Sequence, residues 1–176
     1  MYQNINNINQ DSLNASLRFL DKMGQANAEI LKQTDPEQGE RMEKLGALLT
    51  NEDFCQKFIA CTTKQEAYKL FADNGSDLTE EEINGLALQL KALTQKLIEN
   101  NGELSEEDLE QIAGGANIKS AITTLFVAPA GIGVAAGVGA AIGSVIPGLG
   151  TAAGALVGGV LGVVGTGLAL FFSIWD

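Results

Sequence analysis

Few side chains in this sequence have the types and spacing that chemistry requires. Two cysteines, Cys55 and Cys61, lie six residues apart, and the 176 residues include no histidine. A zinc site would need ligands that the chain lacks, and a cysteine nucleophile would lack its usual imidazole base. Six residues along a helix separate two Cα atoms by about 9 Å, too far for a disulfide. We therefore expect two reduced, apolar cysteines, no cofactor, no metal and no enzymatic activity.

Charge divides the chain into two unlike parts at Gly115. The first 115 residues hold 21 of the 22 acidic and 10 of the 11 basic side chains, whereas residues 116–176 hold 13 of the 21 glycines. With a net charge of −11 and no basic stripe for phosphates, we expect no nucleic-acid partner. Residues 1–10 lack the pattern of a signal peptide, so we expect any export to use another route.

Helix start and stop signals punctuate the acidic part. Asp35 precedes Pro36 as an N-cap before a proline at the first helical position. Capping boxes are expected at Thr63–Glu66, Thr79–Glu82 and Ser105–Asp108, and left-handed C-cap residues at Asn74–Gly75 and Asn100–Gly102. Apolar residues at helical spacing predict helices at 12–33, 36–49, 51–61, 64–73, 80–100 and 106–112. No stretch alternates as a strand does, so we expect an all-α fold.

The segment at the charge boundary reads LSEEDLEQIAGG. A helix as short as 106–112 is marginal alone, so the apolar stripe of Leu104, Leu109 and Ile112 suits the groove of a partner. The segment resembles the double-glycine leader of bacteriocin precursors, L-S-x-x-E-L-x-x-I-x-G-G, with Asp108 in place of the usual glutamate.

This resemblance implies a cleavage site and a partner. A peptidase-containing ABC transporter would hold the three apolar residues and cut after the second glycine, between Gly115 and Ala116. Gly114 and Gly115 suit such a cleft because a backbone without Cβ can be approached closely. The leader would be cytoplasmic, and the peptide that starts at Ala116 would be secreted.

Residues 50–90 resemble a second family. The stretches Asn51–Phe54, Glu66–Phe71 and Gly75–Glu82 are similar to the long nitrile-hydratase-related leaders of ribosomal peptide natural products. This resemblance implies a small helical bundle on which a maturation or export machine docks. It does not cover residues 1–49, which serve either as more leader or as a shield for the apolar tail. We expect an N-terminal helical extension (1–49), a helical leader (50–115) and an apolar mature peptide (116–176).

The tail carries no charge from Ser120 to Trp175. Pro129 and Pro147 divide it, since proline breaks a helix interior, and leave runs of 17 and 28 residues. As helices these runs would be about 25 and 42 Å long, against a hydrocarbon core of about 30 Å. The longer run is long enough to span a membrane, and the pair predicts a Gly/Ala-rich apolar helical hairpin.

A spacing of four residues recurs among the glycines of this tail, in one row of four and in two pairs. Such rows let helix backbones pack closely in lipid, whereas in water each glycine costs about 1 kcal/mol relative to alanine. The predicted packing residues are Gly133, Gly137, Gly139, Gly143, Gly150, Gly154, Gly158 and Gly162. Leu161, Val164, Leu168 and Phe172 would then face acyl chains, with Trp175 at the membrane interface. The alternative is a soluble hairpin or a low-complexity segment.

The tail is similar to the mature region of unmodified double-glycine bacteriocins, with two departures. Lys119 and Asp176 leave it formally neutral, whereas such peptides are usually cationic. It contains no cysteine, so products built on cysteine are excluded, while dehydration of Ser and Thr is not.

Two functions follow as expectations. The first is a precursor of a secreted, membrane-active bacteriocin-like peptide, whose partners are the transporter, a target membrane, and a sister peptide or further copies of itself. The second is an integral membrane protein with a cytoplasmic helical domain and a transmembrane hairpin, acting as a holin-like, immunity or structural component. The absence of a basic flank beyond Lys119 disfavours the second.

Overall fold

A computed structural model describes residues 8–105, 147–162 and 166–175. These residues form seven α-helices and no strand, so the predicted all-α fold is confirmed for the described part of the chain. The helices of the acidic part are α1 (Gln10–Thr34), α2 (Pro36–Thr50), α3 (Glu52–Ile59), α4 (Lys64–Asp73) and α5 (Glu80–Glu99). Each of their ends lies within two residues of the prediction, and the predicted helix at 106–112 lies outside the described residues.

Local capping explains why the acidic part divides at these points. Thr79 and Glu82 form a complete capping box at the start of α5, as predicted. At α4 the box is incomplete, because the Glu66 carboxylate accepts from the N–H and hydroxyl of Thr62, one residue before the N-cap Thr63. Asn9 and Asn51 cap α1 and α3, although neither was predicted as an N-cap.

The described tail residues form α9 (Leu149–Gly162) and α10 (Thr166–Ile174). The sequence predicts one helical run of 28 residues here, and the structure instead assigns helices of 14 and 9 residues. Phe171 of α10 packs against Phe58 of α3, and Trp175, directly after α10, packs against the same ring. Within the described ranges, no helix has both the length and the apolar character needed to cross a bilayer.

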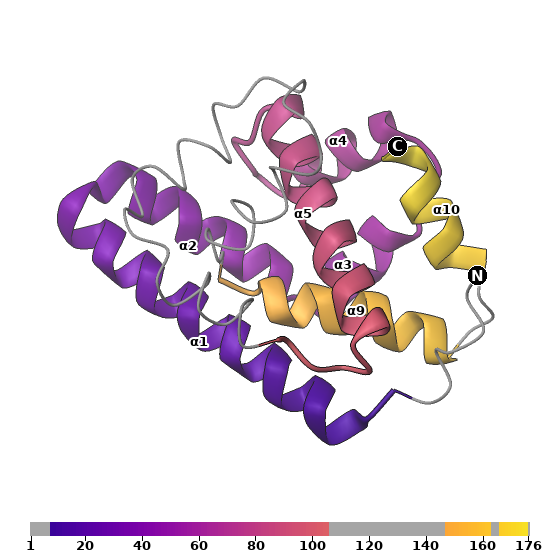
Figure 1. The fold of residues 1–176 in the computed structure, drawn as a ribbon. Helices are drawn as coiled ribbons and strands as arrows, with labels where there is room; N and C mark the ends of the chain where they lie inside the picture. Colours follow the sequence, from indigo (N-terminus) through magenta and orange to yellow (C-terminus); the bar gives the residue numbers. More distant parts are fainter. Residues whose placement is uncertain (1–7, 106–146, 163–165, 176) are drawn as a thin grey trace.

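Helix α9 lies in the middle of the fold, where Figure 1 shows it between α1 and the pair α3 and α5. It also contacts α2 and α10. One cluster of buried side chains includes Leu20 and Leu49 of the first two helices, Leu90 of α5, and Ala153 and Leu156 of α9. The apolar tail and the acidic part therefore share one hydrophobic core.

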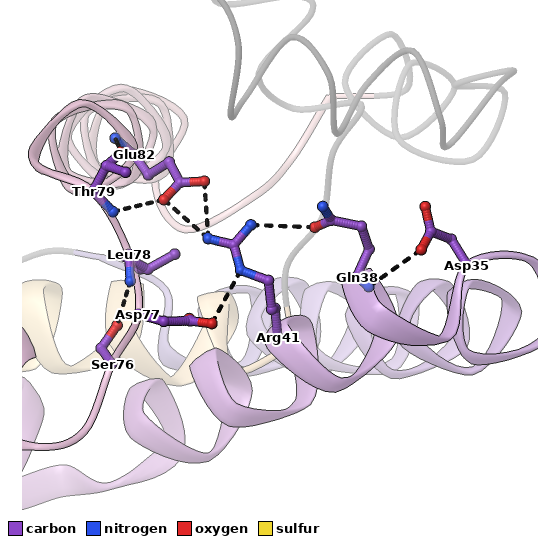
Figure 2. Close-up of polar contacts among 8 residues, drawn as sticks. All are labelled: Asp35, Gln38, Arg41, Ser76, Asp77, Leu78, Thr79 and Glu82. Atoms are coloured by element: carbon purple, nitrogen blue, oxygen red, sulfur yellow. Dashed lines mark hydrogen bonds and ion pairs between the residues drawn. The ribbon is translucent and has the colours of Figure 1, made fainter.

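A partly buried ion pair ties α2 to the start of α5 (Figure 2). Arg41 donates to both carboxylate oxygens of Glu82, at 3.0 and 3.1 Å, and its Nε lies 3.3 Å from Asp77. Glu82 also accepts the N–H of Thr79, and its side chain is only 7% exposed. Burial lowers the pKa of Arg41, but its bonds to the Glu82 and Asp77 carboxylates outweigh burial and raise the pKa overall.

We expect Arg41→Ala to lower the free energy of unfolding by about 3 kcal/mol, because it leaves the buried Glu82 carboxylate without its cation. Urea denaturation of the full-length chain measures this loss. The matched control is Lys69→Ala, which breaks an exposed pair with Asp73 and should cost less than about 1 kcal/mol. Equal effects of the two substitutions would contradict the structural role of Arg41.

Candidate functional site

The structure describes only some of the predicted site residues. Leu104, Gly150, Gly154, Gly158 and Gly162 lie within the described ranges. The following lie outside them: Leu109, Ile112, Gly114, Gly115, Ala116, Gly133, Gly137, Gly139 and Gly143. The candidate site is therefore the interface between the described tail helices and α1–α5, together with the chain around Leu104.

The chain that leads to the double-glycine segment is tied to the start of α1. Gly102 accepts from the Ser16 hydroxyl at 2.9 Å, and the Leu104 N–H donates to the same hydroxyl oxygen at 3.3 Å. Gly102 has a φ of 89°, and an added Cβ would lie 2.9 Å from the Asn9 carbonyl oxygen. The Leu104 side chain is 8% exposed and belongs to the core. This predicted protease anchor is thus buried in the folded chain, with its backbone bonded to Ser16 of α1.

The glycine row of α9 faces α1. A Cβ added at Gly150 would overlap the backbone carbonyl oxygen of Leu17 and lie 2.9 Å from the Asp21 carboxylate. A Cβ added at Gly154 would lie 2.8 Å from the Leu17 side chain. The row was predicted to pack tail helices against each other in lipid, and in the folded chain its first two members instead let α9 approach α1 closely.

The start of α9 is capped by a residue of α1. The Asp21 carboxylate accepts the Thr151 N–H at 3.2 Å and the Thr151 hydroxyl at 3.0 Å. Gly148, the residue before α9, has no side chain that could cap the helix. A carboxylate is favoured at this end because the first N–H groups of a helix carry partial positive charge. Asp21 thus supplies the cap that the tail lacks.

The turn before α9 rests on α2. A Cβ added at Gly46 would lie 2.5 Å from the Pro147 Cβ, so only glycine allows this approach. Gly148 has a φ of 80°, which favours glycine, and its backbone lies against that of Gly46 and Thr50. Pro147 was predicted to divide the tail into helical runs, and the structure places Pro147 and Gly148 against α2.

An aromatic cluster holds α10. Phe58 of α3 makes edge contacts with Phe71, Phe171 and Trp175, with ring centroids 5.3, 5.4 and 6.2 Å away. The Trp175 ring also meets Tyr68, at 6.4 Å. The Phe171 and Trp175 side chains are both buried, at 0% and 2% exposure. Edge contacts of this kind add about 0.5–1.5 kcal/mol each beyond the burial of area.

Two lysines of the acidic part contact the end of α10. Lys91 of α5 donates to the Phe172 carbonyl oxygen at 3.1 Å, and its ammonium lies 5.7 Å from the Phe172 ring centre. Lys64 lies 5.6 Å from the Trp175 ring centre. The Phe172 side chain, predicted to face acyl chains, is 4% exposed, and its partners in this conformation are protein groups. Cations suit the last turn of a helix, whose carbonyls carry partial negative charge.

Comparison with known proteins does not assign the chain to a family. No protein-family model, no curated protein and no solved structure matches it. The arguments below therefore rest on the contacts just described and on the residues of the sequence.

Both cysteines are free and buried, as expected. Burial, aided by the nearby Glu52 carboxylate, raises the pKa of the Cys55 thiol to about 11. The Cys55 thiol donates to the Leu49 carbonyl oxygen. Since the thiolate is the reactive form, a thiol with such a pKa is inert near neutral pH.

Sequence reasoning missed the residues of the acidic part that hold the tail. No sequence pattern singled out Asp21, Lys91 or Leu17. Gly46 could have been noticed from the sequence. Glycine inside a helix costs about 1 kcal/mol, so its presence there suggests that a neighbouring segment packs closely against it. Nothing near Asp21 in the sequence points to Thr151, which lies 130 positions away.

Proposed function

We propose that this chain is the precursor of a secreted, membrane-active bacteriocin-like peptide. In this proposal α1–α5 form a helical leader that carries the Gly/Ala-rich tail in a masked form. A peptidase-containing ABC transporter cuts after Gly115 during export, which yields the peptide from Ala116 to Asp176. In this proposal the peptide bond after Gly115 is cleaved by the transporter, and the chain itself catalyses no reaction.

One observation supports masking above all others: α9 lies at the centre of a bundle of acidic helices. The side chains of Ala152, Ala153, Leu156 and Val157 are each at most 3% exposed. A segment without charge has little to offer water, and burial of apolar surface is the dominant favourable contribution to folding. The leader is thus suited to carry the tail through water.

The same tail residues suit a membrane once the leader is gone. Rows of glycine allow close helix packing in lipid, and we propose that the tail forms a helical hairpin that associates through them, alone or with a sister peptide. Trp175 supports this second environment, because its buried indole N–H has no hydrogen-bond partner among the described residues. Such a group costs about 1–3 kcal/mol, and a membrane interface would satisfy it.

We expect mass spectrometry of secreted material to find a peptide that begins at Ala116 and ends at Asp176. Gly115→Val should block processing, because a β-branched side chain crowds the protease cleft, while Leu109→Ala and Ile112→Ala should weaken it. Leu104→Ala is a less clean test, since Leu104 is buried and its loss also weakens the fold.

Two results would contradict the proposal. If all of these variants are cut normally, the recognition and cleavage residues are wrong. If only the full-length chain is found, in the membrane of the producing cell, the chain acts as an integral membrane protein and not as a precursor.

A further inference from the structure

We propose that the acidic part and the tail stay bound to each other after the cut at Gly115, so that the severed leader is a one-to-one inhibitor of the peptide. The proposal rests on the proposed function for the position of the cut. The ligand of the interface on α1, α2, α3 and α5 is a segment of this same chain, namely α9 and α10, and not an unrelated partner.

Every described contact between the two parts is non-covalent and lies far from Gly115 in the sequence. The described tail begins at Pro147, which is 32 positions beyond the cut, and α5, the last described helix of the acidic part, ends at Glu99, 16 positions before it. Breaking the peptide bond after Gly115 therefore removes none of these contacts. What the cut changes is the entropy of association, because the two parts become separate molecules.

The interface recognises the tail by its helix ends. Asp21 accepts from Thr151 at the start of α9, and Lys91 donates to the Phe172 carbonyl in the last turn of α10. A negative group thus meets a partly positive helix end, and a positive group meets a partly negative one. A tail bound in the reverse direction would place both charges wrongly, so the contacts select one orientation.

Shape adds to this recognition. The Leu17 backbone lies where only a glycine at position 150 allows the approach, and Pro147 lies against Gly46. Phe171 and Trp175 fill the aromatic cluster around Phe58. Charge, close backbone approach at Gly150 and aromatic packing around Phe58 thus all contribute to recognition of the tail.

The test inserts the recognition sequence of a site-specific protease between Gly115 and Ala116 of the full-length chain, outside the described residues. The purified protein is cut and analysed by size-exclusion chromatography. Trp175, the only tryptophan, reports on the docking of α10 through its fluorescence. We expect the two pieces to elute together in equal amounts with unchanged emission. Separation of the pieces, or a red shift of the emission on cutting, would overturn the proposal.

Variants test whether the helix-end contacts hold the complex. Asp21→Asn and Lys91→Ala should each raise the dissociation constant of the cut complex about tenfold, within the usual range for charges at helix ends. The matched control is Glu29→Lys, an exposed position on α1, which should leave it unchanged. Circular dichroism of the uncut variants checks that they fold. If Asp21→Asn folds but binds as tightly as the parent, recognition by helix ends is wrong.

Dye release separates failure of this inference from failure of the proposed function. The probes are vesicles of equimolar phosphatidylcholine and phosphatidylglycerol. We expect the cut parent complex to release less dye than the cut Asp21→Asn complex. If the pieces separate and the free tail releases dye, the inference alone fails. If the pieces stay together but the tail freed by denaturation and dilution releases none, the proposed membrane activity fails and the complex stands.

Discussion

Gly150→Ala is expected to lower the free energy of unfolding of the full-length chain by about 2 kcal/mol. The added Cβ would overlap the Leu17 carbonyl oxygen, which cannot move without shifting α1, and such overpacking costs about 3 kcal/mol. Higher helix propensity of alanine returns about 1 kcal/mol. Denaturation followed by circular dichroism and Trp175 fluorescence measures the difference.

Gly154→Ala is the matched control, one turn along the same face. Its Cβ would lie 2.8 Å from the end of the flexible Leu17 side chain, which can rotate away, so the net change should be below about 1 kcal/mol. In a Leu17→Ala background, Gly154→Ala should become stabilising, whereas Gly150→Ala should remain destabilising. If both substitutions stabilise the parent chain equally through helix propensity, the glycine row does not pack on α1.

The second large effect is expected from Phe58→Ala, at about 4 kcal/mol. Phe58 is 2% exposed and contacts aromatic rings of α3, α4 and α10, so its removal leaves a cavity where the tail meets the acidic part. A domain of this size has a free energy of unfolding of about 5–15 kcal/mol, so this loss is a large fraction of the total. Urea denaturation measures it, and the emission of Trp175 should shift to the red because its ring loses a partner.

Tyr68→Phe provides the control for Phe58. It keeps an aromatic ring against Trp175 and removes only the hydroxyl that donates to Asn84 at 2.9 Å. The expected cost is about 1 kcal/mol, with little change in emission. A Phe58→Ala variant that unfolds like the parent and keeps its emission would show that α10 is not docked on α3.

The helices of the acidic part could be predicted because their causes are local. Asp35 and Pro36 start α2, and Thr79 and Glu82 start α5, through bonds that span at most three residues. Asn101 and Gly102 end α5 with φ angles of 54° and 89°, as the Asn-Asn-Gly triplet indicates. The missed caps at Asn9 and Asn51 are also local, and the rule that predicts asparagine at an N-cap covers them.

The candidate site could be predicted only in part. The spacing of Gly150 and Gly154 identified a surface that a neighbouring backbone approaches closely. The spacing did not identify the neighbouring helix, because close packing on a lipid-embedded helix and close packing on α1 both require small residues at these positions. Leu104 was predicted to be an anchor for the groove of a partner, and only the structure shows that it is buried beside Ser16 in the folded chain.

By itself, the sequence determined that an uncharged, glycine-rich tail follows an acidic helical part, and that this tail needs cover from water. Only the tertiary structure decided what covers it. The hydrophobic effect is non-directional and depends only on the apolar area that is buried. Composition therefore predicts that the tail is buried, but not which residues bury it. The tail-binding roles of Asp21, Gly46 and Lys91 arise only when folding brings these residues to the ends and the turn of the tail helices.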